Sequence, residues 1–223
     1  PTAINAITIP AISGQNVVCV GSSSQLTGSG TPASSNAWLS SNPSIASVSN
    51  GVVTGINQGI STITYTNSDG CSANIVVTVN PIPVVSNITP SAICSGNSFL
   101  VTPANGGGIS SNDIVPAGTT YTWTVVDNTN VTGDTNQTIA QTSISQTLIN
   151  LTDTDQTVVY TVTPSVGSCV GATFTVTVTV NPKPVIPAQT STICSGAAFT
   201  VTPVNAAPTT IVPAGTTYTW TVV

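Results

Sequence analysis

Five cysteines carry the most specific chemistry that this 223-residue sequence offers. Their positions are Cys19, Cys71, Cys94, Cys169 and Cys194. In two successive stretches, one cysteine precedes an early strand and another lies in the hairpin before the last strand, with Trp38 or Trp123 between them. Pairing of these thiols would place the protein in an oxidising compartment. Metal binding by the cysteines is not expected, because the sequence has no CxxC pair and no histidine.

Two pairing schemes are compatible with this spacing. In the first, the bridges lie within modules, as Cys19–Cys71 and Cys94–Cys169. In a standard sandwich, however, a strand of about 20 Å separates the two cysteines of a module, and bridged Cα atoms lie within about 7 Å. The second scheme is therefore a staggered bridge from Cys19 to Cys169 of the next module. Both schemes stay open, and we expect Cys194 to belong to a module whose later cysteine follows Val223.

Aspartates are the second group with chemical potential. Asp153 and Asp155 in LTDTDQ are candidate calcium ligands, together with Asp127 or Asp134. The competing and favoured hypothesis is a turn in which Asp caps its own backbone. The same carboxylates could be imagined as a glycosidase pair, but no identifiable partner would raise a pKa. Without histidine the serine–histidine and cysteine–histidine mechanisms are excluded, so we predict no catalytic residue, no enzyme activity and no cofactor.

Three tryptophans could stack on sugar rings. They are Trp38, Trp123 and Trp220. Each lies on an alternating strand that follows the first cysteine of its module, where a sandwich places its core tryptophan. We therefore predict that all three are core residues.

The charge of the chain excludes several partners. Charged residues make up 3% of the sequence, with six aspartates and Lys183 as the single base. One base cannot neutralise a row of phosphates, so no nucleic-acid partner is expected. No run of about 18 apolar residues exists, so no membrane insertion is expected either.

The elements that must position these residues are short strands. The segment FTVTVTV (174–180) alternates apolar and threonine side chains, and TYTWTVV (120–126) does the same. Turn sequences such as NSDG and PAGT separate the strands, and no stretch shows a helical stripe. The pattern predicts an all-β protein built of Ig-like antiparallel β-sandwich domains.

Internal repeats set the predicted domain boundaries. The segment IVPAGTTYTWTVV occurs at 114–126 and again at 211–223, and Cys94 and Cys194 are 100 residues apart. We predict domains at 1–80 and 81–181, and the start of a further domain at 182–223. Proline-rich joints between them are expected to be stiff, which predicts a rod-like tandem array that is part of a longer chain.

Two families are similar to these modules. WLSSNPSIASVSNGVVTGINQGISTITYT (38–66) resembles a group 2 bacterial Ig-like domain. ICSG, IVPAGTTYTWTVV and CVGATFTVTVTVNPKP resemble the PKD-like repeats of large Bacteroidota surface proteins. This resemblance implies an extracellular or cell-surface location, in secreted giants that include the gliding-motility adhesin exported by the type IX system.

The predicted function is structural. We expect a segment of a large secreted adhesin or extracellular filament, acting as spacer or stalk and as contact surface. The alternative is an accessory carbohydrate-binding or spacer module of a secreted polysaccharide-degrading enzyme. Expected partners are the neighbouring modules of the same chain, with lateral self-association or surface glycans as further hypotheses.

Overall fold

The computed structural model describes residues 10–106 and 112–221 of the chain. These residues form strands and turns and contain no helix, which confirms the all-β fold class. Contacts divide the chain into two compact units. The first comprises Pro1–Val84, Ile114–Thr119 and Ser165–Gly171, and the second comprises Val85–Asp113, Thr120–Pro164 and Ala172–Val223.

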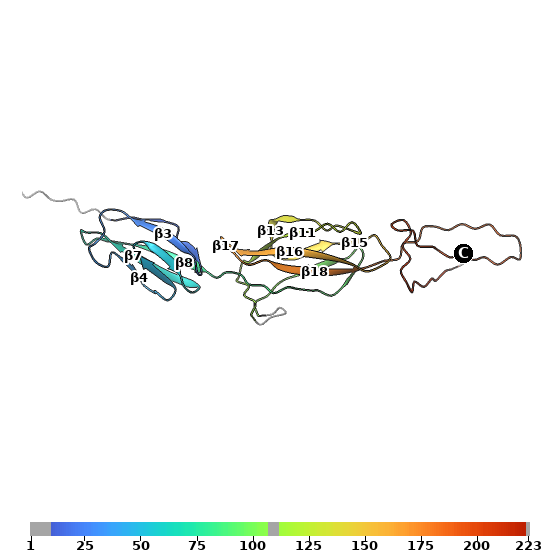
Figure 1. Ribbon diagram of the computed structural model, residues 1–223, viewed down its shortest axis with the longest axis horizontal. Helices are drawn as coiled ribbons and strands as arrows, with labels where there is room; N and C mark the ends of the chain where they lie inside the picture. The colour runs from blue at the N-terminus through green and yellow to red at the C-terminus, as the bar shows by residue number, and fades with distance from the viewer. Residues whose placement is uncertain (1–9, 107–111, 222–223) are drawn as a thin grey trace, which may run out of the picture. The chain divides into compact units, whose positions relative to one another are not determined.

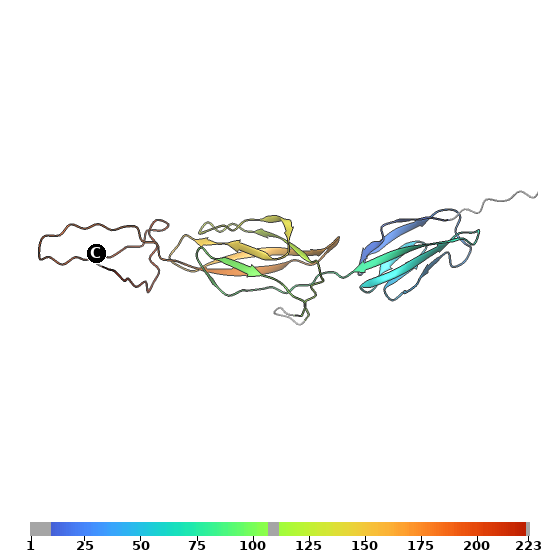
Figure 2. The same ribbon diagram turned by 180° about the vertical axis from the view of Figure 1, so that it is seen from behind.

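The first domain is a sandwich of two four-stranded sheets, drawn in blue to cyan in Figure 1 and seen from behind in Figure 2. Its strands are β1 (Ile12–Gly14), β2 (Val17–Cys19), β3 (Ser23–Gly28), β4 (Trp38–Ser40), β5 (Ala46–Ser49), β6 (Val52–Gly55), β7 (Gly59–Thr66) and β8 (Ser72–Asn80). One sheet has the order β1-β3-β6-β5 and the other β2-β8-β7-β4. The strands pair antiparallel, except that β2 runs parallel to β8. This is the predicted Ig-like sandwich.

Alternating side chains from both sheets form the core of the first domain. Val77 and Val79 of β8 and Ile63 of β7 are at most 2% exposed, and they pack with Leu26 and Val53 of the facing sheet. Burial of such a side chain stabilises a fold by about 1.5–3 kcal/mol. The threonines between them on β7 stay half-buried, as the period of two requires.

Tyr65 links β7 to the loop after β3. Its hydroxyl donates a hydrogen bond to the carbonyl oxygen of Gly30 at 3.1 Å, and its ring packs on Trp38 with centroids 4.7 Å apart. A Cβ on Gly28 would collide with the Tyr65 ring. Glycine is therefore required at position 28 for steric reasons.

The second domain is drawn in green to orange in Figure 1. Its strands are β9 (Ile93–Cys94), β10 (Ser98–Val101), β11 (Thr120–Val125), β12 (Val131–Thr132), β13 (Gln137–Gln141), β14 (Ile144–Thr147), β15 (Ile149–Asn150), β16 (Gln156–Val166), β17 (Cys169–Val170) and β18 (Phe174–Asn181). The main sheet has the order β13-β11-β16-β18-β9, and β17 also pairs with β16. Two smaller sheets are formed by β10 with β14 and by β12 with β15.

The core of the second domain follows the same alternation. The residues at most 2% exposed on β16 and β18 are Val158, Tyr160, Val162, Phe174, Val176, Val178 and Val180. The Tyr160 ring packs on Phe99 of β10 with centroids 5.3 Å apart, and the Tyr121 ring meets Phe174 edge-on at 6.3 Å. The alternation read from FTVTVTV therefore gives the correct inward face.

Residues 182–221 contain turns and isolated bridges but no strand. Trp220 is 83% exposed, so the prediction that it is a core residue is wrong in this structure. The described residues supply no sheet neighbours for this segment, and without them an alternating strand has nothing to pack against. Tyr218 is exposed for the same reason.

Candidate functional site

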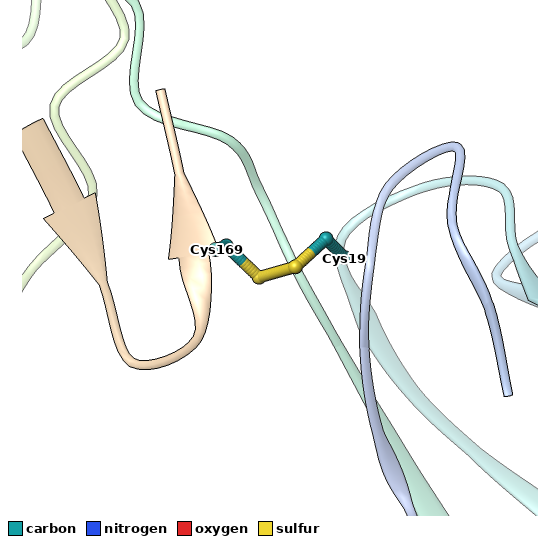
Figure 3. The surroundings of a disulfide bond; sticks show 2 residues. All are labelled: Cys19 and Cys169. Carbon is teal, nitrogen blue, oxygen red and sulfur yellow. A yellow bond between two sulfur atoms is a disulfide. The ribbon is translucent and has the colours of Figure 1, made fainter. Parts of the chain in front are cut away.

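One disulfide joins Cys19 to Cys169, with a Cα–Cα distance of 5.6 Å (Figure 3). This is the staggered scheme of the two that the sequence leaves open. Neither bridge within a module is formed, and Cys71, Cys94 and Cys194 keep free thiols. The reason is positional, because Cys19 ends β2 while Cys71 precedes β8, whose other end pairs with Cys19.

Backbone pairing positions Cys19. It lies opposite Asn80 in the parallel pair of β2 with β8, and the N–H of Val20 donates to the carbonyl oxygen of Asn80 at 2.9 Å. A Cβ on Gly55 would lie 2.6 Å from the Cys19 carbonyl oxygen, so glycine allows β6 to approach this residue. Cys19 is thus held by both sheets of the first domain.

A tight hairpin positions Cys169. Cys169 pairs with Val166 across the turn between β16 and β17, and Gly167 in that turn has φ of 56°. Figure 3 shows Cys169 next to this hairpin, on the far side of the sulfur–sulfur bond from Cys19. Cys169 is 1% exposed, whereas Cys19 is half-buried.

The segments around the disulfide belong to the first compact unit. This unit includes Ile114–Thr119 and Ser165–Gly171 as well as the first domain. Val84 and Ile114 exchange two backbone hydrogen bonds, at 2.9 and 2.8 Å. The predicted boundaries at 80 and 181 fall on the last residues of β8 and β18. Two segments beyond the first boundary, Ile114–Thr119 and Ser165–Gly171, nevertheless belong to the compact unit of the first domain.

The calcium candidates Asp153 and Asp155 lie in the loop between β15 and β16. No group of three or more His, Cys, Asp or Glu residues that could hold a metal ion occurs within the described part of the chain. Asp134 instead accepts a hydrogen bond from the Asn128 N–H at 2.9 Å, and so acts as a local backbone acceptor. Calcium binding by Asp153 and Asp155 stays the less favoured of the two hypotheses for this loop.

Asn150 organises that same loop, although it is not among the functional candidates that the sequence suggests. Its side chain is 1% exposed. The amide nitrogen donates to the carbonyl oxygens of Thr154 and Val180 at 2.7 and 2.9 Å, and the amide oxygen accepts from the N–H and hydroxyl of Thr152, both at 2.8 Å. The Asn-x-Thr sequence before the aspartates could have indicated this role. An asparagine side chain often accepts a hydrogen bond from the backbone N–H of the residue two positions later.

Asp113 plays a comparable role elsewhere in the second unit. It is 4% exposed and accepts hydrogen bonds from the N–H and hydroxyl of Ser86, at 2.9 and 2.7 Å. Hydrogen bonds to a carboxylate are stronger than neutral ones, so Asp113 ties its own segment to that of Ser86.

The tryptophans of the two complete domains are packed. Trp123 is 4% exposed, and its indole N–H donates to the Thr135 carbonyl oxygen at 3.1 Å. Trp38 is half-buried against the first core. Trp123 therefore does not offer a free ring face for stacking on a sugar.

An open groove of about 360 Å³ lies over the second domain. It is lined by Thr122, Trp123, Thr124, Gln137, Thr138, Thr161, Thr163 and Thr173. These side chains are neutral, and most carry a hydroxyl that can donate and accept hydrogen bonds.

Two tyrosines have shifted pKa values. Burial raises the pKa of Tyr121 to about 12. Burial also raises the pKa of Tyr160, and the nearby negative charge of Asp134 raises it further. Both tyrosine hydroxyls therefore stay protonated near neutral pH. A general base works best with a pKa near the working pH, so neither tyrosine is suited to that role.

Family comparisons identify both domains. Residues 11–78 match the family model of the bacterial Ig-like domain (group 2), and residues 91–184 match that of the PKD-like domain. The chain therefore carries a group 2 bacterial Ig-like domain followed by a PKD-like domain. No curated protein sequence is significantly similar to the chain.

Solved structures give weaker matches. A SusE-like surface-located polysaccharide-binding protein from the heparin utilisation locus of Bacteroides thetaiotaomicron is 11% identical, with a TM-score of 0.28, over 78% of this chain and 34% of that one. InvD of Yersinia pseudotuberculosis is 11% identical with a TM-score of 0.32, over 82% and 61%. The N-terminal eight Ig domains of the Down syndrome cell adhesion molecule are 14% identical with a TM-score of 0.23, over 78% and 28%.

The chain spans less than two thirds of each of those proteins. Within the described residues, no helix is long and apolar enough to cross a membrane.

Proposed function

We propose that this chain is a structural, non-catalytic segment of a large secreted adhesin or extracellular filament, acting as stalk and contact surface. The observation that carries the proposal is the Cys19–Cys169 disulfide, which covalently joins the Ig-like domain to the PKD-like domain. A link of this kind transmits force between consecutive domains without relying on their noncovalent contacts.

Two further observations support an extracellular location. Disulfides persist in oxidising environments outside the cytosol. Lys183 is the single base of the chain and is followed by Pro184, so proteases that cleave after basic residues have little to cleave. Both properties suit a protein exposed at the cell surface.

The resemblance of the repeats supports a finer assignment. We place the parent protein among the type IX secreted adhesins of Bacteroidota, the group that includes the adhesin of gliding motility. The neighbouring modules of the same chain are its proposed partners. Detection of the chain on the surface of intact cells, and its loss from the surface when type IX secretion is blocked, is the outcome expected.

Single-molecule stretching tests the mechanical role. When the chain is pulled from its two ends, the 150-residue loop closed by the disulfide should stay unextended. A reductant should then release roughly 500 Å of additional length, at about 3.4 Å per residue. The Cys19→Ser variant is the matched control and should extend fully without reductant. Equal extension with and without reductant in the unmodified chain would overturn the mechanical role.

The threonine-lined groove favours a second candidate function, the recognition of surface glycans. Neutral hydroxyl and amide groups can bond to sugar hydroxyls, but the packed Trp123 provides no stacking surface, which argues for weak binding. A glycan array probed with the full chain would test it. Binding that is lost in the Thr161→Ala, Thr163→Ala double variant would support this function. If the chain binds no glycan, the stalk function is the only one that remains proposed.

A further inference from the structure

Three cysteines occupy the same kind of turn. Cys19, Cys94 and Cys194 each precede by two residues a glycine with positive φ, at 80°, 87° and 86°. In each turn, the N–H three residues after the cysteine donates to the cysteine carbonyl oxygen, at 2.9, 3.0 and 3.0 Å. We name these three residues the turn cysteines.

Cys19 and Cys94 also share their strand pairing. Cys19 lies opposite Asn80 in a parallel pair, and Cys94 lies opposite Asn181 in another. In both, the residue after the cysteine donates its N–H to that asparagine carbonyl oxygen at 2.9 Å. Asn80 and Asn181 each end the last strand of their domain. Cys94 thus holds in the second domain the position that Cys19 holds in the first.

The remaining two cysteines precede the last strand of a domain. Cys169 begins β17, just before β18, and Cys71 lies between β7 and β8. Asn67 fixes Cys71 in its turn, because its side-chain oxygen accepts the Cys71 N–H at 2.9 Å and its own N–H donates to the Cys71 carbonyl oxygen at 2.9 Å. We name Cys71 and Cys169 the hairpin cysteines.

The disulfide present in the structure joins a turn cysteine to the hairpin cysteine of the following domain. Cys94 and Cys194 are exposed turn cysteines with free thiols, and Cys71 is a half-buried hairpin cysteine with a free thiol. The bonded state of Cys19 is the independent observation that this backbone setting receives a sulfur partner. It is the same setting as that of Cys94.

We propose that Cys71, Cys94 and Cys194 form the same turn-to-hairpin disulfide with another module. In a solution of this chain alone, that module belongs to a second copy, and Cys71 of one copy pairs with Cys94 or Cys194 of the other. The inference goes beyond the proposed stalk function, because it concerns covalent joining between chains and holds for any role of the domains.

The chemistry requires a small-molecule disulfide as oxidant, such as oxidised glutathione. The thiolate of one cysteine attacks this disulfide, forms a mixed disulfide and releases one molecule of reduced glutathione. The thiolate of the second cysteine then attacks the mixed disulfide and releases the other. Two electrons pass from the two cysteines to the oxidant, and the two cysteine protons end on the released thiols.

The test uses the full chain, concentrated in a buffer of oxidised and reduced glutathione. We expect disulfide-linked dimers and larger multimers on non-reducing gels. Mass spectrometry of the linked peptides should show Cys71–Cys94 and Cys71–Cys194 bonds, with Cys19–Cys169 retained. Indiscriminate oxidation would instead favour Cys94–Cys94 and Cys94–Cys194 bonds, because these two thiols are the exposed ones.

Two variants make the test decisive. Cys71→Ser should abolish the multimers, and so should the Cys94→Ser, Cys194→Ser double variant. Unchanged thermal unfolding of both variants would show that the loss does not come from misfolding. Multimers that persist in Cys71→Ser, or an unmodified chain that stays monomeric throughout, would overturn the proposal.

Discussion

Residues 120–124 and 217–221 share the sequence TYTWT, but they have different structures. The first copy lies in β11, where Tyr121 and Trp123 are 2% and 4% exposed. The second copy forms no strand, and its Tyr218 and Trp220 are 45% and 83% exposed. An identical sequence therefore has two outcomes within one chain.

The residues just before each copy behave alike. In both, the first residue of IVPAGTT exchanges two backbone hydrogen bonds with a valine, Val84 with Ile114 and Val185 with Ile211, at 2.8–2.9 Å. In both, a threonine hydroxyl donates to the proline carbonyl oxygen at 2.7 Å. These contacts form in both copies from the residues that precede the strand, whereas the strand needs its neighbours β13 and β16, which come from residues 137–166.

The largest expected effect comes from giving the second copy the same context. A chain extended after Val223 by a copy of residues 127–181 should form a further cooperative domain, worth about 5–15 kcal/mol of unfolding free energy. Acrylamide quenching of tryptophan fluorescence should decrease as Trp220 becomes buried, and this decrease should vanish in a Trp220→Phe version. Unchanged quenching would show that sheet neighbours are not the missing factor.

The next largest effect is the difference in stability between alanine substitutions of the two tryptophans. Trp123→Ala should lower the unfolding free energy by about 3–5 kcal/mol, because it leaves a cavity in a packed core. Trp220→Ala should change it by less than about 0.5 kcal/mol, as for other exposed residues. Urea unfolding followed by circular dichroism measures both, and similar costs for the two variants would contradict the comparison.

Asn150 belongs to the context that only the first copy has. Asn150→Ala should destabilise the second domain by about 1–3 kcal/mol, because the Val180 and Thr154 carbonyl oxygens lose their donor. The matched control is Asn130→Ala at an exposed position, with an expected change below about 0.5 kcal/mol. Equal decreases in the midpoint of thermal unfolding in the two variants would show that Asn150 has no special role in stabilising the domain.

Alkaline titration should detect the burial of Tyr121 in the first copy through its raised pKa. Its pKa is raised by burial from 10.0 to about 12, so the folded state holds this proton more tightly than the unfolded state. The resulting stability is fully present below pH 10 and is lost as pH rises through about 12. Ultraviolet absorbance of tyrosinate should show a late step that Tyr121→Phe diminishes. A late step of the same size in that variant would contradict the assignment.

The smallest expected effect is that of calcium. Since no group of three or more His, Cys, Asp or Glu residues that could hold a metal ion occurs in residues 10–106 and 112–221, we expect calcium or a chelator to leave the midpoint of thermal unfolding unchanged. A rise of that midpoint with calcium, removed by Asp153→Asn with Asp155→Asn, would instead establish the loop as a calcium site.

Much of the fold was predictable from the alternation of side chains. The inward faces of β11 and β18 follow from TYTWTV and FTVTVTV, and the last residues of β8 and β18 coincide with the repeated Asn-Pro joints. Asn150 was missed because its value depends on Val180, 30 residues away, whose carbonyl oxygen it satisfies. Trp220 is exposed although its segment alternates, because the alternation describes a face without showing whether anything covers it.

By itself, the sequence determined the all-β class, the repeated turns and the absence of a histidine-based site, because these depend on composition and on residues close along the chain. Only the tertiary structure decided which cysteine meets Cys19. The parallel pairing of β2 with β8 sets Cys19 at the opposite end of the strand from Cys71, and the turn after β16 delivers Cys169 instead. A disulfide needs both Cα atoms within a few ångströms, and such a distance is fixed by strand pairing rather than by spacing in the sequence.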